Sequence, residues 1–220
     1  MNLAPLLLLC IAMLAFAANS LLCRLALGSF AMDPVSFTSL RIVSGALLLA
    51  ALHVARGGAR DWRFDAVSAG ALYAYASLFS LAYVSLAAGT GALLLFSAVQ
   101  LTMLSVAIAR GERPSALAWS GFGAAVLGLV YLLKPGLAMP APRAAAMMLG
   151  AGVAWGIYSL RGARGHDPVA ATTWNFVAAA PLALLVSATG LSTVGINTPG
   201  IIAALLSGMG ASALGYVVWY

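Results

Sequence analysis

Charged side chains are scarce in this sequence, and their scarcity argues against a soluble globular domain. Only 7% of the 220 residues are Asp, Glu, Lys or Arg, whereas 63% are hydrophobic. Soluble domains average about 25% charged residues. The net charge of +6 does not indicate a nucleic-acid partner, because the basic residues stand singly or in small groups between apolar blocks. We therefore expect the lipid bilayer to be the solvent of this chain.

Cysteine and histidine are equally rare, which leaves little material for metal or catalytic chemistry. Cys10 and Cys23 both lie in the first apolar segment, and His53 and His166 lie at the ends of apolar segments. This pattern predicts no disulfide framework, no metal site and no cofactor. A membrane-embedded enzyme is not expected either, since it would need a reactive pair such as Ser and His inside the bilayer. The sequence has no P-loop glycine motif, so transport driven directly by ATP is not expected.

What the chain has instead is long runs without charge, which can be converted into membrane crossings. A helix needs about 20 apolar residues to cross the hydrocarbon core of a bilayer. Two of the runs are about twice that length and must fold back, one near 87–91 and one near 189–200. The sequence therefore predicts an all-α transmembrane bundle of eight spans, within 1–23, 34–52, 66–109 (two spans), 114–133, 144–160 and 168–220 (two spans).

The loops between these spans predict the orientation of the chain, because Lys and Arg are retained on the cytoplasmic side. With the N-terminus inside, seven basic residues lie in cytoplasmic loops and three in outer loops. We therefore expect a multi-pass protein of the inner (plasma) membrane with a cytoplasmic N-terminus. The inner set is Arg56, Arg60, Arg63, Arg110, Arg113, Arg161 and Arg164, and the outer set is Arg24, Lys134 and Arg143.

An internal repeat relates the two halves of the chain. DPVSFTSLRIVSGALLLA from Asp33 aligns without gaps with DPVAATTWNFVAAAPLAL from Asp167, with seven identical positions. The repeat unit holds five spans, an odd number, so the second copy must have inverted topology, as in many secondary transporters. We expect one repeat over 1–137 and a second over 138–220. The second copy ends at Tyr220 inside its third helix, so we expect eight spans of an original ten in a truncated chain.

These motifs, in this order, resemble the EamA-type transporters of the drug/metabolite transporter superfamily. The resemblance rests on DPVSFTSLR, GERP at 111–114, the glycine-rich GFGAAVLGLVYLLKPG, AWGIYSL and ALGYVVWY, and covers essentially the whole chain. It implies ten helices in two inverted repeats, both termini in the cytoplasm, and transport of small metabolites through a central cavity. The chain departs from that pattern in lacking helices nine and ten and in having Phe16 where the first repeat often has Trp.

Polar side chains well inside the spans are the candidates for a solute site. Arg41 is the strongest candidate, because a guanidinium inside a transmembrane helix usually faces a cavity or a partner. It could attract a substrate carboxylate. Alternatively, it could snorkel to the outer interface, or pair with Asp33 or a lipid phosphate and lock the fold. Its repeat mate is Asn175. The full set of substrate-binding candidates is Asn19, Arg41, Gln100, Trp155, Tyr158 and Asn175.

Acidic residues are absent from the middle of every predicted span, so coupling through a buried carboxylate is not supported. Glu112 stands between Arg110 and Arg113, where we expect a structural ion pair. Gly152 and Gly156, and the similar pair Ala124 and Gly128, permit close helix contact within the monomer or between protomers, and we expect the former.

These features together predict a secondary transporter, an exporter of a small metabolite such as an amino acid or a drug-like amphipathic solute. A lipid-carrier flippase or a non-transporting membrane assembly protein remains an alternative. The expected partners are the lipid bilayer and a small-molecule substrate; the oligomeric state is not predicted.

Overall fold

The protein folds as a bundle of helices in a computed structural model that describes residues 3–58, 65–133, 140–162, 167–191 and 195–219. Within those ranges every regular element is helical, and the elements join into eight continuous helices. They are α1 (Leu3–Arg24) with a π-helical turn (Leu25–Ser29), α2 (Pro34–Ala55), α3 (Ala66–Tyr83), α4 (Ala88–Ala109), α5 (Ala116–Leu133), α6 (Pro142–Gly162), α7 (Pro168–Val186) with a π-helical turn (Ser187–Leu191), and a last helix made of α8 (Thr198–Leu205), a π-helical segment (Leu206–Leu214) and α9 (Gly215–Trp219).

The eight helices lie where the sequence predicts spans, but not all of them qualify as spans. Six are long and apolar enough to cross a membrane. The described apolar part of α5 is shorter, and α6 begins and ends with an arginine, Arg143 and Arg161. Large apolar side chains are exposed on the outside of the bundle, for example Leu14 at 70% and Leu117 at 82%, as expected where lipid is the solvent. The chain is therefore a helical membrane protein with at least six candidate spans in the described ranges.

Two Asp-Pro pairs fix where α2 and α7 begin. Asp33 caps α2 by accepting the backbone N–H of Ser36 at 2.7 Å, with Pro34 as the first helical residue. Asp167 caps α7 by accepting the N–H groups of Val169 and Ala170, both at 3.0 Å. Because the cap satisfies free N–H groups and proline fits the first turn, the Asp-Pro motif starts both helices at the equivalent residue.

One predicted turn lies slightly elsewhere. The chain reverses at 84–87, just before the predicted 87–91, and Gly89 and Gly91 belong to the first turns of α4. A Cβ atom on Gly91 would lie 2.4 Å from the Tyr83 ring. Gly91 therefore allows α4 to pack closely against Tyr83 at the end of α3, and it does not form the turn that glycine indicates in the sequence.

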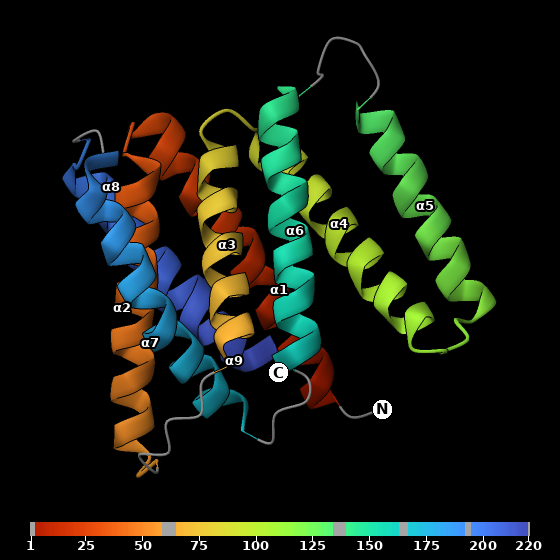
Figure 1. The fold of residues 1–220 in the computed structure, drawn as a ribbon, viewed down its shortest axis with the longest axis horizontal. Coiled ribbons are helices and arrows are strands. Elements are labelled where there is room, and N and C mark those ends of the chain that lie inside the picture. The colour runs from red at the N-terminus through yellow and green to blue at the C-terminus, as the bar shows by residue number, and fades with distance from the viewer. Residues whose placement is uncertain (1–2, 59–64, 134–139, 163–166, 192–194, 220) are drawn as a thin grey trace.

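Most helices pack closely on one or two neighbours (Figure 1). α3 packs on α6, α6 also packs on α4, and α2 packs on α7. The last helix lies against α1 and α2, whereas α5 packs chiefly on α4 and stands at the edge of the bundle. A Cβ atom on Gly152 would lie 2.5 Å from Ala98 Cβ, and one on Gly156 would lie 2.9 Å from Thr102. The predicted small-residue contact is therefore within the monomer, between α6 and α4.

Candidate functional site

The centre of the candidate site is Arg41, whose side chain is buried in the bundle with 2% of its surface exposed. It lies on α2 about two turns after the Asp33 cap. From there the guanidinium reaches α3 and the last helix, both of which pack against α2. The snorkelling position that the sequence left open is not adopted.

Three hydroxyl groups from two other helices accept hydrogen bonds from Arg41. Its Nε donates to Ser212 Oγ at 2.9 Å, and its Nη2 donates to the hydroxyls of Tyr216 at 2.9 Å and Tyr75 at 3.2 Å. The guanidinium carbon also lies 5.2 Å from the ring centres of Tyr75 and Phe79. Ring faces attract cations, so this arrangement stabilises the charge without neutralising it.

No acidic residue pairs with Arg41 among the described residues. The ion pair that the described residues do form joins Asp65 and Arg161, away from Arg41. Asp33, the acid that the sequence offered as a partner, caps its own helix instead. The Arg41 Nη1 is buried without a hydrogen-bond partner. A buried, partly unpaired cation is costly, and an anion could supply the hydrogen-bond acceptor that Nη1 lacks.

Asn19 of α1 joins the same network through Tyr75. Its Nδ2 donates to the Tyr75 hydroxyl at 3.1 Å, and its Oδ1 accepts from the Ser207 hydroxyl at 2.6 Å. The Tyr75 oxygen therefore receives hydrogen bonds from both Asn19 and Arg41. This one phenol connects α1, α2 and α3, and Ser207 extends the connection to the last helix.

Aromatic rings form the wall beside these polar groups. The Trp155 ring centre lies 4.5 Å from that of Tyr216, 5.0 Å from Tyr75 and 5.3 Å from Tyr158, on which it stacks. The Phe16 ring meets the Trp155 ring edge-on at 5.7 Å. Phe16 and Trp155 occupy equivalent positions in the sequence motifs AFAANSL and AWGIYSL, and their rings are in contact beside the polar network.

The space left between these side chains is small. A void of about 10 Å³ lies among Asn19, Tyr75, Phe79, Trp155 and neighbouring residues of α1, α3 and α4. That volume corresponds to about one water molecule. A solute of metabolite size would therefore enter only after the aromatic wall had moved.

Two of the predicted residues border the network without bonding to Arg41. Tyr158 stacks on Trp155, and its hydroxyl lies near Thr172 and Asn175 of α7. Both Tyr158 and Asn175 are buried. Asn175 thus adjoins the site through Tyr158.

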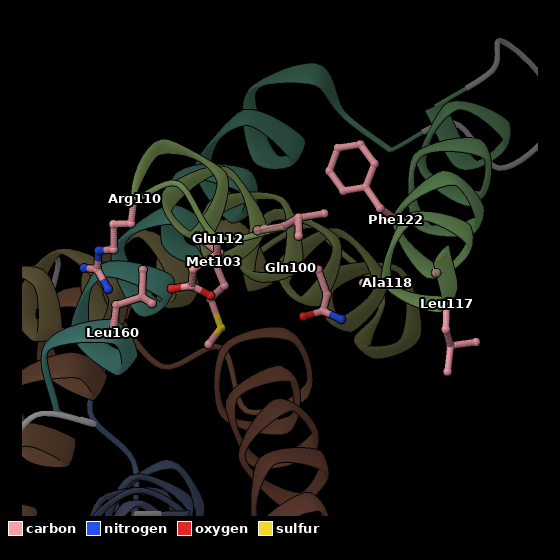
Figure 2. A pocket seen from close by; sticks show the side chains of 11 residues that line it. Gln100, Met103, Arg110, Glu112, Leu117, Ala118, Phe122 and Leu160 are labelled. Carbon is pink, nitrogen blue, oxygen red and sulfur yellow. The ribbon is translucent and has the colours of Figure 1, made fainter. Parts of the chain in front are cut away.

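Gln100, another predicted residue, lies apart from the network. It is exposed on α4, because the buried face of that helix consists of Gly91, Leu94, Leu95, Ala98 and Val99. Figure 2 shows its side chain in a cavity of about 490 Å³ between α4 and α5, which Arg110, Glu112 and Leu160 also line.

The ion pair predicted at the corner after α4 is not formed in the described residues. Arg110, Glu112 and Arg113 are all exposed there, and no oxygen of Glu112 comes within ion-pair distance of either arginine. Asp65 at the start of α3 instead pairs with Arg161 at the end of α6. The hydrogen bond from Arg161 lowers the pKa of Asp65 to about 2, and hydrogen bonds from Ser68 and the Val67 N–H act in the same direction.

The main residues that the sequence did not single out are Ser207, Ser212 and Tyr216 of the last helix. Small residues surround them in LSGMGASALGYVVWY, a composition that is typical of close helix packing. A signal was present nonetheless, since Ser212 and Tyr216 stand four residues apart and so share one helix face. No group of three His, Cys, Asp or Glu side chains that could hold a metal occurs in the described ranges.

Comparison with known proteins identifies relatives without a stated activity. No protein-family model matches the chain. It is 50% identical over 216 residues to the uncharacterized protein PA1977 of Pseudomonas aeruginosa. The aligned region covers 98% of this chain and 75% of that protein. A solved structure described only as the crystal structure of a protein is 22% identical, with a TM-score of 0.67, over 95% of this chain and 76% of that one. This second likeness concerns the fold alone.

Proposed function

The chain belongs to the same family as the uncharacterized protein PA1977 of Pseudomonas aeruginosa, and we propose that it is a secondary transporter of small amphipathic metabolites that carry an anionic group. The observation that carries this proposal is the buried guanidinium of Arg41, which has neutral partners and one unpaired nitrogen. Ionisable residues inside membrane bundles commonly mark a substrate pathway. An amino acid exporter of the EamA type fits these features.

The packing of the helices supports the inverted repeat on which this proposal draws. α2 and its repeat mate α7 pack on each other and run in opposite directions (Figure 1). α3 packs on α6, and the repeat equivalents of these two, the last helix and α1, also pack together. Such exchange of contacts is what a two-fold axis between repeats 1–137 and 138–220 would produce.

Different side chains of the site would bind the anionic and the apolar parts of an amphipathic solute. The anionic group would take the Arg41 Nη1, which has no partner of its own. The Tyr75 and Tyr216 hydroxyls could turn from Arg41 toward the solute, and the rings of Trp155 and Tyr158 would contact its apolar part. Alternating access would then consist of opening this network toward one side of the membrane at a time.

The membrane and the orientation belong to the same proposal. The count of basic loop residues favours the inner (plasma) membrane with the N-terminus in the cytoplasm. In that orientation α2 begins, and α7 ends, at the outer surface.

Thermal-shift measurements on the purified protein in detergent test the proposed solute site. The panel comprises amino acids, organic anions, organic cations, nucleosides and lipid-carrier head groups. A ligand at 100 times its dissociation constant adds about 2.7 kcal/mol of stability. We expect a saturable shift with one class of anionic solute, loss of that shift in Arg41→Ala, and no loss in Arg113→Ala, which removes an equal charge from an exposed corner.

The same panel contains the results that oppose the proposal. An anion-induced shift that survives in Arg41→Ala would remove Arg41 from the solute site. A shift produced by lipid-carrier head groups alone would favour a flippase. Uptake of the identified solute into proteoliposomes then distinguishes transport from binding.

A further inference from the structure

A second cavity lies at the end of the bundle where α2 and α6 begin and α3 and α7 end. Its volume is about 490 Å³, within the range of small-molecule sites. None of its lining residues belongs to the Arg41 network. On α3, Tyr73 and Ser77 are four residues apart and face this cavity, whereas Tyr75 and Phe79 face Arg41. The helix thus separates two distinct sites.

Most of the cavity wall is hydrocarbon. Val35 of α2, Leu81 of α3 and Val186 of α7 line it, together with the half-buried ring of Tyr73. Such a wall favours an apolar body, since each CH₂ group removed from water contributes about 0.8 kcal/mol. The wall alone would accept many apolar molecules, so its polar groups decide the class of ligand.

Arg143, in the first turn of α6, is the one charged residue that the structure describes in this lining. No ion pair or hydrogen bond joins its side chain to another of the described residues. The hydroxyls of Thr38 and Ser39 are already engaged, with Ser80 at 2.8 Å and with Ser187 at 2.6 Å. The Ser77 hydroxyl, in contrast, is buried without a partner. The polar groups left for a ligand are thus a cation and a hydroxyl.

We propose that this cavity binds an amphipathic anion, whose carboxylate or phosphate meets Arg143 and whose hydrocarbon part lies against Val35, Leu81 and Tyr73. An amine or a zwitterion would find no acidic residue among the described residues of the lining to receive its positive group. The shared chemistry is that of an anionic lipid of the bilayer or of a free amphipathic acid that reaches the protein from solution.

Photolabelling of the purified chain in phosphatidylcholine nanodiscs tests this assignment. The probe is decanoate that carries a diazirine near the end of its chain. We expect labelled peptides from the start of α2 and the end of α3, with competition by octanoate but not by octylamine. Arg143→Gln should reduce labelling about tenfold, Arg143→Lys should retain most of it, and Arg113→Gln should leave it unchanged, because only Arg143 lines the cavity.

A second variant keeps the test independent of charge. Val35→Trp fills the cavity from the partly buried Val35 position, so labelling should fall by a similar factor although Arg143 is intact. Gel filtration and circular dichroism verify that each variant is folded. Labelling that maps to other helices, or that persists in both Arg143→Gln and Val35→Trp, would overturn the proposal.

The two sources of the anion are separated by the composition of the disc. If phosphatidylglycerol in the disc suppresses labelling in proportion to its content, the occupant is a lipid. If octanoate competes equally in neutral and anionic discs, the occupant is a free acid. Arg41→Met should leave this labelling unchanged, so failure of the solute site and failure of this cavity are separate outcomes.

Discussion

A single buried charge dominates the molecule at the scale of residues. The Arg41 side chain donates hydrogen bonds to Ser212, Tyr75 and Tyr216, all of which are neutral. Isolating a cation in a bundle costs several kcal/mol, and hydroxyl groups recover only part of that cost. Under the proposed function, Arg41 serves to attract an anion rather than to stabilise the fold.

Exchanging Arg41 for an apolar side chain of similar length should therefore separate function from stability. Arg41→Met removes the uncompensated charge, so we expect a melting temperature equal to or above that of the wild type in the absence of ligand. Binding of the anionic solute should fall by a factor of about 100 or more, as expected when charge-assisted hydrogen bonds are lost. Thermal unfolding and ligand titration measure the two effects. A fall in stability of more than about 2 kcal/mol would show instead that Arg41 is a structural lock.

Arg24, unlike Arg41, should contribute to the stability of the fold and not to solute binding. Its Nη1 donates to the carbonyl oxygens of Tyr83, the last residue of α3, at 3.0 Å and of the C-cap residue Val84 at 2.9 Å. These groups have no partner within their own helix. Arg24→Ala should lower the free energy of unfolding by about 1 kcal/mol and leave solute affinity unchanged.

Unfolding in mixed detergent gives the stability of this variant. Arg113→Ala serves as the control because Arg113 is exposed and forms no hydrogen bond to a helix end within the described part of the chain. Equal stability of the two variants would contradict the capping role of Arg24.

At the scale of elements, the π-helical segment of the last helix is packed against α2 with almost no spare space. A Cβ atom on Gly208 would lie 2.2 Å from Ser44 Oγ and 2.3 Å from the carbonyl oxygen of Arg41. Gly210 lies in the same segment with nothing within 4 Å of its Cβ position. The two glycines therefore have the same backbone setting but different surroundings.

This pair provides a matched comparison. Gly208→Ala should push the segment away from α2 and cost about 2 kcal/mol more than Gly210→Ala, since both gain the same helical propensity but only the first overpacks. Gly208→Ala should also weaken solute binding, because Ser212 and Tyr216 move with the segment. Thermal unfolding compares the variants directly, and equal stabilities would mean that α2 and the last helix can separate freely.

The link between the start of α3 and the end of α6 should respond to acid. The pKa of Asp65 is about 2 in the folded protein and about 4 in an unfolded chain. A lowered folded pKa stabilises the fold above pH about 4, and that stabilisation is lost as the pH falls from about 4 to about 2.

Asp65→Asn lacks this contribution at every pH. The difference in melting temperature between wild type and variant should stay constant from pH about 8 to about 5, then shrink as the pH approaches 2. Arg161→Gln should behave in the same way. A difference that persists undiminished at pH about 2 would exclude the ionised Asp65 as its source.

At the scale of the whole molecule, the proposed topology can be tested by labelling. Glu112, after α4, and Ile196, before α8, are both exposed and should lie on opposite sides of the membrane. In a background without Cys10 and Cys23, a membrane-impermeant maleimide should label Ile196→Cys in intact cells. It should label Glu112→Cys only after the cells are opened, because the basic residues favour a cytoplasmic corner there. The reverse pattern would invert the orientation.

The architecture was largely predictable because hydropathy and helix caps are local properties. The charge-free runs located all eight helices, and the Asp-Pro pairs located the starts of α2 and α7. It was harder to predict which helices are long and apolar enough to cross a membrane, because α6 has an arginine near each end and only part of α5 counts as apolar.

The candidate site was predictable only in part, because it depends on which helix faces meet. Arg41 and Asn19 were recognisable as polar residues inside apolar helices, and both belong to the network. Gln100 met the same criterion but faces away, since the buried face of α4 is defined by its neighbours Val99 and Ala98. The hydroxyls of Ser212 and Tyr216 matter only because the last helix packs on α2, a contact between residues more than 170 positions apart.

Trp155 gives the site an optical signature. Its indole is 3% exposed and lies within 5.3 Å, ring centre to ring centre, of three tyrosines from α3, α6 and α9. Those phenols can transfer excitation energy to it, and an indole in so dry a setting emits at short wavelength. Any motion that admits a solute must separate these rings and wet the indole. Under the proposed function, in a variant that retains Trp155 as its one tryptophan, the emission wavelength should shift to the red when the bundle opens to a solute.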